Sequence, residues 1–263
     1  MLKVRKGDKR MEKKRKQLDF TKDLMFCEVM KDLEVCKELI ERIINKSLER
    51  IVYSNQQETI TAGTDVRSIR LDVLVETKDK ELIDVEMQVG NYSSLPLRFR
   101  GYQSIIDSSY WNRGDLFKDL KETYIIFLCL NDPFSSNLPL YTFEPCCRQD
   151  ILTDYDFKLH WIALNSSAWK SAPPSIKNLL KYMYTNKCQD GDELIQKIDE
   201  IVLSTNKNAE KAVNMTTVQD KIDEFNNYFE DQARQLKSQA KEIKSKDKEI
   251  EDLKKQIEDL KKK

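Results

Sequence analysis

Apolar and polar residues alternate along two short segments, residues 70–76 and 82–89, which a polar turn at residues 77–80 separates. Successive side chains of a β-strand point to opposite faces, so the alternation predicts a hairpin of two strands. In the second strand one face would carry Ile83, Val85, Met87 and Val89, and the other Asp84, Glu86 and Gln88. In the first strand Leu71, Val73 and Val75 would oppose Arg70, Asp72 and Leu74. Carboxylates are costly when merely buried, so the polar face of this hairpin needs an explanation.

The other elements follow from helical spacing and from continuous apolar runs. Three- and four-residue steps of apolar side chains predict a helix over residues 19–46, with a break near Lys31 and a restart at Asp32. The unbroken apolar run at residues 122–130 is typical of a central strand covered on both faces. Further strands are predicted at residues 51–53, 140–143 and 158–164, a polar connection at the sheet edge at 56–64, and helices at 97–111, 173–187 and 192–204. This mixture indicates an α/β core.

A seven-residue repeat occupies the C-terminal part of the chain, residues 206–263. The first position of the repeat is apolar throughout, at Met215, Ile222, Phe229, Leu236, Ile243, Ile250 and Ile257. The fourth position of the repeat, three residues after the first, is apolar in only some of the repeats. It is polar at Gln232, Gln239 and Lys246. The pattern predicts a coiled coil that joins copies of the chain into a homo-oligomer, because no other segment matches the seam. The alternative is a single helix stabilised by its charges.

Charge and composition limit the classes of partner. The 263 residues include 45 Lys and Arg and 45 Asp and Glu, so the net charge is zero. A chain without net charge is not expected to coat nucleic acid as a histone does, but a local basic patch or a bound metal ion can still bind phosphate. Residues 1–16 hold nine Lys and Arg, which indicates either a disordered, solvated leader or an electrostatic handle for nucleic acid. We therefore expect this leader, a domain over residues 17–205 and the helix over 206–263.

The residue types that bind zinc are few and scattered. The six cysteines show no CxxC spacing, and His160 is the only histidine, in an apolar segment where a structural role is expected. We expect reduced thiols in a cytoplasmic protein. No apolar run reaches the ~18–20 residues that a membrane span needs, so no membrane partner is predicted.

The polar face of the hairpin is then the candidate for chemistry, because side-chain parity places Asp72 beside Glu86 and Gln88. Asp72 and Glu86, with the backbone carbonyl of Met87, would hold Mg²⁺ or Mn²⁺, which polarises a phosphoryl oxygen and activates water for in-line attack. Gln88 would orient that water or contact the scissile phosphate. The spacing alone fits equally well an amphipathic hairpin with exposed polar residues.

Three segments of the chain resemble the PD-(D/E)XK nuclease family transposases, also called the Rpn family of recombination-promoting nucleases. They are Arg70-Leu71-Asp72-Val73, Ile83-Asp84-Val85-Glu86-Met87-Gln88 and Leu95-Pro96-Leu97-Arg98 with Tyr102-Gln103-Ser104. The resemblance implies a restriction-endonuclease-like fold, in which helices flank a mixed central sheet, and Mg²⁺-dependent DNA cleavage linked to recombination or mobile elements. It also implies that Asp72 and Glu86 bind the metal. Gln88 stands where the superfamily usually has Lys, so hydrogen bonds replace a positive charge there.

Further side chains are candidates on weaker grounds. The resemblance offers Glu38 or Glu41 as a third carboxylate ligand of the metal, and an exposed helix face explains them as well. Arg98 and Tyr102 lie four positions apart, hence on one helical face. There they would either contact DNA phosphate or form a surface pair with the Arg packed over the Tyr ring. Asp84 shares the face of Glu86 and would either support it or face solvent.

Two functions remain after these observations. The first is a metal-dependent DNA endonuclease with an α/β core and a C-terminal coiled coil, which would join the active sites needed to cut both strands of a duplex. The second is a catalytically inactive DNA-binding and oligomerising scaffold on the same fold. Neither reading involves an organic cofactor.

Overall fold

The computed structural model describes residues 17–60, 69–90, 92, 94–146, 156–208, 211 and 213–221, with residues 238, 239, 243, 244, 246 and 250. The chain divides into two compact units, Met1–Thr216 and Thr217–Lys263. The expected basic leader at residues 1–16 and most of the heptad repeat lie outside the described residues.

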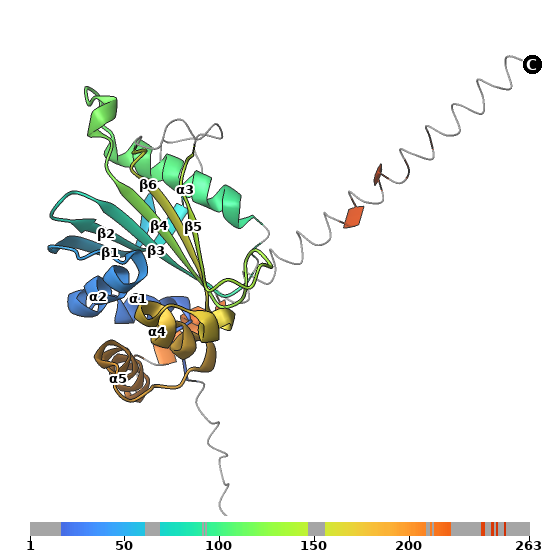
Figure 1. The fold of residues 1–263 in the computed structure, drawn as a ribbon. Helices are drawn as coiled ribbons and strands as arrows, with labels where there is room; N and C mark the ends of the chain where they lie inside the picture. The colour runs from blue at the N-terminus through green and yellow to red at the C-terminus, as the bar shows by residue number, and fades with distance from the viewer. Residues whose placement is uncertain are drawn as a thin grey trace, which may run out of the picture. The chain divides into compact units, whose positions relative to one another are not determined.

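A mixed sheet of six strands forms the centre of the described part of the first unit (Figure 1). Its strands are β1 (Ile51–Ile60), β2 (Ile69–Thr77), β3 (Leu82–Gln88), β4 (Thr123–Cys129), β5 (Leu140–Phe143) and β6 (Leu159–Asn165). They lie in the order β1-β2-β3-β4-β6-β5. Strands β1, β2 and β3 pair antiparallel, β4 is parallel to β3 and β6, and β5 pairs antiparallel with β6. With the flanking helices, this sheet confirms the expected restriction-endonuclease-like α/β fold class.

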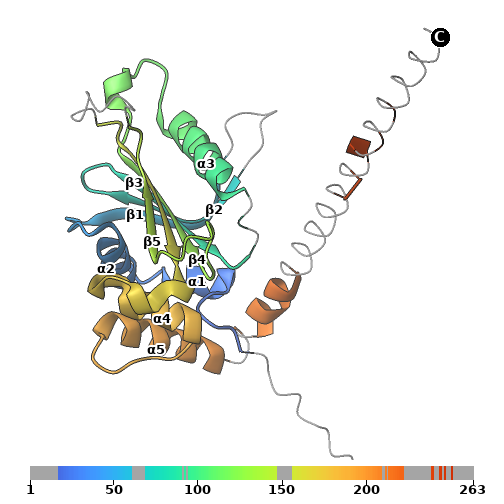
Figure 2. The same cartoon turned by 45° about the vertical axis from the view of Figure 1, so that its right-hand side comes forward.

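Helices cover both faces of the sheet (Figures 1 and 2). One face carries α1 (Asp23–Val29), α2 (Leu33–Ile44), α4 (Pro174–Thr185) and α5 (Glu193–Lys207), and the other carries α3 (Leu95–Tyr110). Two short 3₁₀ helices are η1 (Phe117–Asp119) and η2 (Ser166–Ser171). The core therefore consists of two hydrophobic clusters, one on each face of the sheet.

Strand β4 lies between these two clusters and contributes side chains to both. All seven of its residues are buried, as the unbroken apolar run predicts for a strand covered on both faces. Ile126 and Leu128 pack in the cluster beneath the four helices, while Ile125 and Phe127 pack beneath α3. Phe127 also meets Phe99 of α3 edge to face, with ring centroids 4.8 Å apart. This contact fixes α3 over the centre of the sheet.

The N-terminal elements refine the sequence expectations. The predicted helical region is two helices, and Asp32 caps the second by accepting hydrogen bonds from the N–H groups of Glu34 (3.0 Å) and Val35 (3.2 Å). Strand β1 runs over ten residues, so the prediction of a strand limited to residues 51–53 was too short. The polar stretch continues the strand because it pairs with β2 along the sheet edge, and pairing outweighs its weak β-propensity.

Side-chain parity holds along β3 but fails at one residue of β2. Val85 and Met87 pack under the four helices with Val73, as alternation predicts. Leu71 was expected on the same face, yet it packs on the α3 side of the sheet with Leu74. Leu71 is next to Asp72 and lies outside the paired part of the two strands, because the β2–β3 pairing ends at Val73 with Val85. Simple alternation therefore no longer applies at this end of β2.

The two ends of the described domain are joined to each other. The backbone N–H of Leu18 donates to Asn206 Oδ1 (3.0 Å), and Asn206 Nδ2 donates to the carbonyl of Leu18 (2.8 Å). These residues are 188 positions apart in the chain. Phe20, which follows Leu18, packs on Tyr182 of α4 with ring centroids 5.9 Å apart. The first and the last segments of the domain thus close the same hydrophobic cluster.

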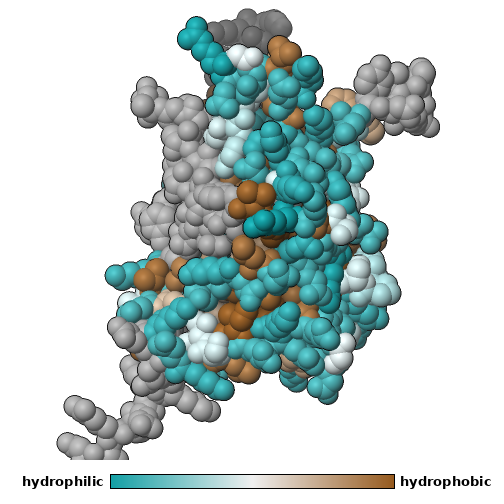
Figure 3. All heavy atoms as spheres, turned by 90° about the vertical axis from the view of Figure 1, so that its left-hand side faces the viewer, coloured by the Kyte–Doolittle hydropathy of each residue, from teal (hydrophilic) through white to brown (hydrophobic). Residues whose placement is uncertain are grey.

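The surface is largely polar on the face that Figure 3 presents, where hydrophobic side chains gather only in small groups. The buried apolar side chains form the two clusters, while several large ones, among them Leu97, Phe117 and Phe157, are exposed. Within the described ranges, no helix is both long and apolar enough to cross a membrane.

The second unit is helical at its described positions, which include residues 217–221, 243 and 250. Ile243 and Ile250, which belong to the first position of the heptad repeat, are 60% and 49% exposed. Two isoleucines seven positions apart on a helix lie on one stripe. The coiled coil itself stays a prediction.

Candidate functional site

Asp72 on β2 and Glu86 on β3 lie side by side where these strands stop pairing. Glu86 Oε1 accepts a hydrogen bond from the backbone N–H of Asp72 (2.8 Å), and Asp72 Oδ2 accepts one from the N–H of Met87 (3.0 Å). Each carboxylate thus takes up a main-chain donor of the opposite strand. Asp72 is 7% and Glu86 3% exposed. The two carboxylates are therefore held in a fixed and nearly buried arrangement.

Helix α3 brings Arg98 and Tyr102 to the same place. The Tyr102 hydroxyl donates to Glu86 Oε2 (3.0 Å), and Arg98 Nη2 donates to the Tyr102 oxygen (3.1 Å). Arg98 Nη2 also lies 3.7 Å from Glu86 Oε2. The guanidinium does lie over the Tyr102 ring, 5.5 Å from its centroid, as the surface-pair reading expects. The pair nevertheless belongs to the carboxylate cluster and is not an isolated surface contact.

Gln88, the last residue of β3, has both ends of its amide engaged. Its Oε1 accepts from Arg98 Nη1, and its Nε2 donates to the carbonyl of Gly90. The hydroxyl of Tyr92 donates to the main-chain carbonyl of Gln88 (3.2 Å). Tyr92 also accepts from the N–H of Asn131 after β4 (3.0 Å), so it ties the ends of the two strands together. Tyr92 could not be singled out from the sequence, because its partners are main-chain atoms and one of them, the N–H of Asn131, is 39 positions away.

Asp84 is the third carboxyl group of the cluster. It is 0% exposed, and neither of its oxygen atoms accepts a hydrogen bond from a donor within the described ranges. The suggestion that it faces solvent is therefore wrong. Burial, followed by repulsion from Glu86 and Asp72, raises the pKa of Asp84 well above its ordinary value.

The other charges of the site respond to burial and to each other. Burial raises the pKa of Glu86, against the opposing effect of the Asp72 N–H and of Arg98. Burial lowers the pKa of Arg98, but Tyr102 and Glu86 raise it, and the net shift is upward. Burial, and then Glu86, raise the pKa of Tyr102. Arg98 therefore stays charged and Tyr102 stays protonated at neutral pH.

The donor set suits a hard divalent cation. Among the described residues, no group of three or more His, Cys, Asp or Glu side chains is arranged to hold a metal ion. Mg²⁺ does not require one, because it commonly binds one or two carboxylates and completes its shell with waters and substrate phosphate. Asp72 and Glu86 supply two carboxylates, and the oxygens of the adjacent Asp84 lack donors within the described ranges. These residues fit Mg²⁺ or Mn²⁺.

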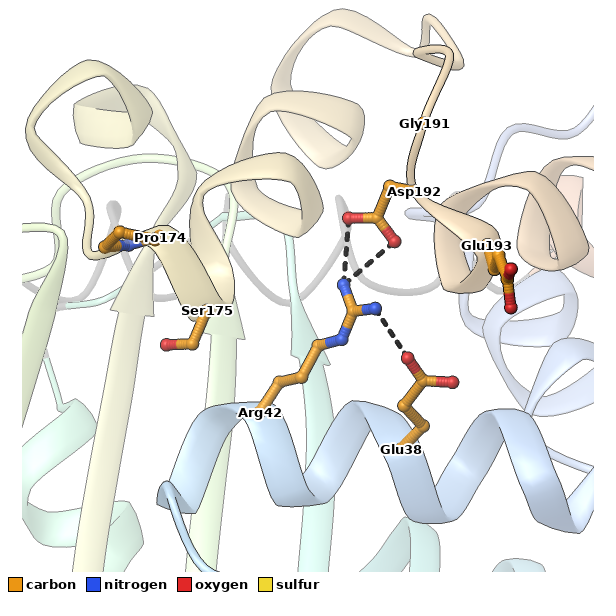
Figure 4. Close-up of a pocket in the computed structure, with 7 residues that line it drawn as sticks. All are labelled: Glu38, Arg42, Pro174, Ser175, Gly191, Asp192 and Glu193. Atoms are coloured by element: carbon orange, nitrogen blue, oxygen red, sulfur yellow. Dashed lines mark hydrogen bonds and ion pairs between the residues drawn. The ribbon is translucent and has the colours of Figure 1, made fainter.

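Glu38 and Glu41 on α2 have other partners. Glu38 accepts from Arg42 (2.5 Å), whose Nη1 also donates to both Asp192 oxygens at 2.9 Å, in the pocket of Figure 4. Glu41 accepts from the backbone N–H of Leu48 (2.6 Å). These bonds fasten α2 to α5 and to the start of β1. The carboxyl group that lies against Glu86 is Asp84, which comes from the same strand.

Comparison with known proteins adds one match. The family model described as PD-(D/E)XK nuclease family transposase matches residues 16–246. No curated protein and no solved structure gives a significant match. The matched range contains every residue of the cluster around Asp72 and Glu86.

Proposed function

The chain belongs to the PD-(D/E)XK nuclease family transposases, and we propose that it is a divalent-metal-dependent DNA endonuclease that acts in recombination or on mobile elements. One observation carries this proposal. Asp72 and Glu86 are held beside each other by main-chain donors of the opposite strand, next to a charged arginine. A merely amphipathic hairpin would expose these side chains, whereas here they are nearly buried.

Asp72 and Glu86 would hold Mg²⁺ or Mn²⁺. Such a cation, when bound, lowers the pKa of water and polarises a phosphoryl oxygen. Tyr102 fixes the orientation of Glu86 through its hydroxyl. Hydrolysis forms a bond between a water oxygen and phosphorus and breaks one phosphorus–oxygen bond of the DNA backbone. The attacking water releases a proton to solvent, and the departing sugar oxygen takes one up.

The proposal is tested by plasmid cleavage with the purified full-length protein. Nicking of supercoiled DNA is expected with Mg²⁺ or Mn²⁺ and not with a chelator. Asp72→Asn removes a carboxylate charge that the cation needs, and it is expected to slow cleavage at least about 100-fold, as loss of an electrostatic contact to the transition state does. Asp79→Asn, an exposed change in the turn of the same hairpin, is the matched control. Equal cleavage by Asp72→Asn and the wild type would exclude this site.

The alternative function is a catalytically inactive DNA-binding scaffold on the same fold. One observation favours it, because Asp72 and Glu86 each accept a hydrogen bond from a main-chain donor of the opposite strand, which gives both carboxylates a structural role. Calorimetry with Mn²⁺ separates the two functions. The nuclease requires binding that Asp72→Asn weakens, and the scaffold predicts no binding to either protein.

We further propose that residues 206–263 form a homo-oligomeric coiled coil that pairs the domains over residues 17–205, while the leader at 1–16 contacts DNA. The thiols of Cys36, Cys129, Cys146 and Cys188 form no disulfide within the described ranges, in keeping with the cytoplasmic location that we propose. Ile243→Asp in the full-length chain puts a charge on the heptad stripe, and it is expected to shift the mass in light scattering towards the monomer. Ser238→Asp, an exposed helical position off the stripe, should leave the mass unchanged. Equal masses for both variants would rule out the proposed seam.

A further inference from the structure

We propose that Arg98 supplies the positive charge at the attacked phosphate and that Gln88 is a positioning residue that holds Arg98 there. The inference rests on the proposed nuclease function and assigns new roles within the same site. It transfers the contact with the scissile phosphate from the strand residue Gln88 to the helix residue Arg98.

The contacts of Arg98 place its charge at the site without neutralising it. The guanidinium is held at one nitrogen by Gln88 and at the other by Tyr102. Its distance of 3.7 Å to Glu86 is that of an ion pair longer than a direct hydrogen bond. The ring of Phe127 lies 4.8 Å beneath the guanidinium carbon. With 28% of the side chain exposed, Arg98 is both fixed and open to solvent.

The remaining donors of Arg98 suit a phosphate. A guanidinium carries five N–H groups, and the bonds to Gln88 and Tyr102 use two of them. Arg presents its donors as a planar fork that matches phosphate oxygens, and it stays charged throughout the working pH range. Negative charge builds up on the oxygens of the phosphoryl group during transfer, so a fixed cation beside the metal ligands stabilises the transition state.

The contacts of Gln88 explain why a neutral amide occupies this position. Its carbonyl oxygen accepts from Arg98, and its amino group donates to Gly90. A lysine at position 88 would offer no acceptor to Arg98 and would place two cations side by side. Gln88 and Arg98 therefore act as a pair, in which the strand residue is neutral and positions the helix residue, and the helix residue supplies the positive charge.

The test measures kcat and KM for cleavage of a DNA duplex by full-length variants. Arg98→Met keeps much of the aliphatic stem and removes the charge, and it is expected to lower kcat at least about 100-fold with a smaller change in KM. Arg100→Met, an exposed change on the same helix, should keep the wild-type kcat. Arg98→Lys retains a charge without the fork, and we expect an intermediate kcat.

Gln88→Met tests the positioning role. It is expected to lower kcat about 10-fold in the wild type and to have no further effect in Arg98→Met, because a positioning residue acts only through its partner. Gln88→Lys combined with Arg98→Met should recover part of the lost kcat by returning a cation to the strand. Equal effects of Gln88→Met in both backgrounds, or a wild-type kcat in Arg98→Met, would overturn the inference.

Mn²⁺ calorimetry provides a readout that does not depend on cleavage. Removing the cation beside Glu86 in Arg98→Met is expected to tighten Mn²⁺ binding several-fold, whereas Arg100→Met should leave it unchanged. Unchanged Mn²⁺ affinity in Arg98→Met would count against the inference. If the wild type binds Mn²⁺ but cleaves no DNA, the proposed nuclease function fails. If Asp72→Asn is inactive while Arg98→Met is fully active, only the role of Arg98 fails.

Discussion

Replacing Glu86 by glutamine is expected to abolish DNA cleavage while the fold stays intact. The carbonyl oxygen of a glutamine at position 86 can still accept from the N–H of Asp72. Its amino group can donate to the oxygen of Tyr102, whose hydroxyl donates to Glu86 in the wild type. The hydrogen bonds of the site are therefore preserved in number. The negative charge is lost, and with it one of the two carboxylates that the cation needs.

We expect cleavage by Glu86→Gln to fall by at least about 100-fold and Mn²⁺ binding to weaken in calorimetry. The free energy of unfolding in the absence of metal should change by no more than about 1 kcal/mol, measured by urea denaturation. Glu76→Gln is the matched control, because Glu76 lies on the same hairpin and pairs with Lys121 at its surface. A Glu86→Gln protein that cleaves as well as Glu76→Gln would show that Glu86 is not a metal ligand.

Replacing Asp84 by asparagine is expected to stabilise the metal-free protein at neutral pH. Burial and the charges of Glu86 and Asp72 raise the pKa of Asp84 in the folded state, and the positive charge of Arg98 offsets this only in part. The folded protein therefore binds more protons at this position than the unfolded chain, whose aspartate pKa is about 3.9. The contribution of Asp84 to stability is complete below that pH and is lost as the pH rises towards the folded-state pKa.

The asparagine side chain in Asp84→Asn would carry no charge at any pH and can donate an N–H to Glu86. We expect the free energy of unfolding to rise by about 1–3 kcal/mol at pH 8, the typical cost of a buried polar group without partners, and by less at pH 5. Urea denaturation in a chelator at both pH values measures this difference. The exposed Asp79→Asn should change neither value. If Asp84→Asn changes the free energy of unfolding equally at pH 5 and pH 8, the charge of Asp84 does not destabilise the folded protein.

The local sequence pattern was sufficient for features that depend on neighbouring residues. The apolar run of β4 predicted a strand buried on both faces, and Asp32 marked the start of α2. Parity within a hairpin placed Asp72 next to Glu86, because the turn fixes which residues lie opposite each other. Parity failed at Leu71, where side-chain bonds replace the regular ladder.

Contacts between distant segments could not be read from spacing. Nothing in the sequence shows that α3 crosses the sheet so that Arg98 meets Gln88 and Tyr102 meets Glu86. The helix spacing of Glu38 likewise gave no sign that Arg42, its neighbour, binds Asp192 at a distance of 150 positions along the chain. Burial of Asp84 depends on the layer of α3 above the sheet, which a two-residue period does not reveal.

The closure of the domain by Leu18 and Asn206 bears on how the chain matures during synthesis. The proposed site lies between residues 72 and 102, so its side chains leave the ribosome long before α5 does. Yet α5 and Asn206 complete the hydrophobic cluster on which β2 and β3 rest. Contacts of such long sequence separation form late. A nascent chain is therefore expected to hold all its proposed catalytic groups before it can organise them, and the proposed nuclease activity would arise only once the domain has been synthesised to its end.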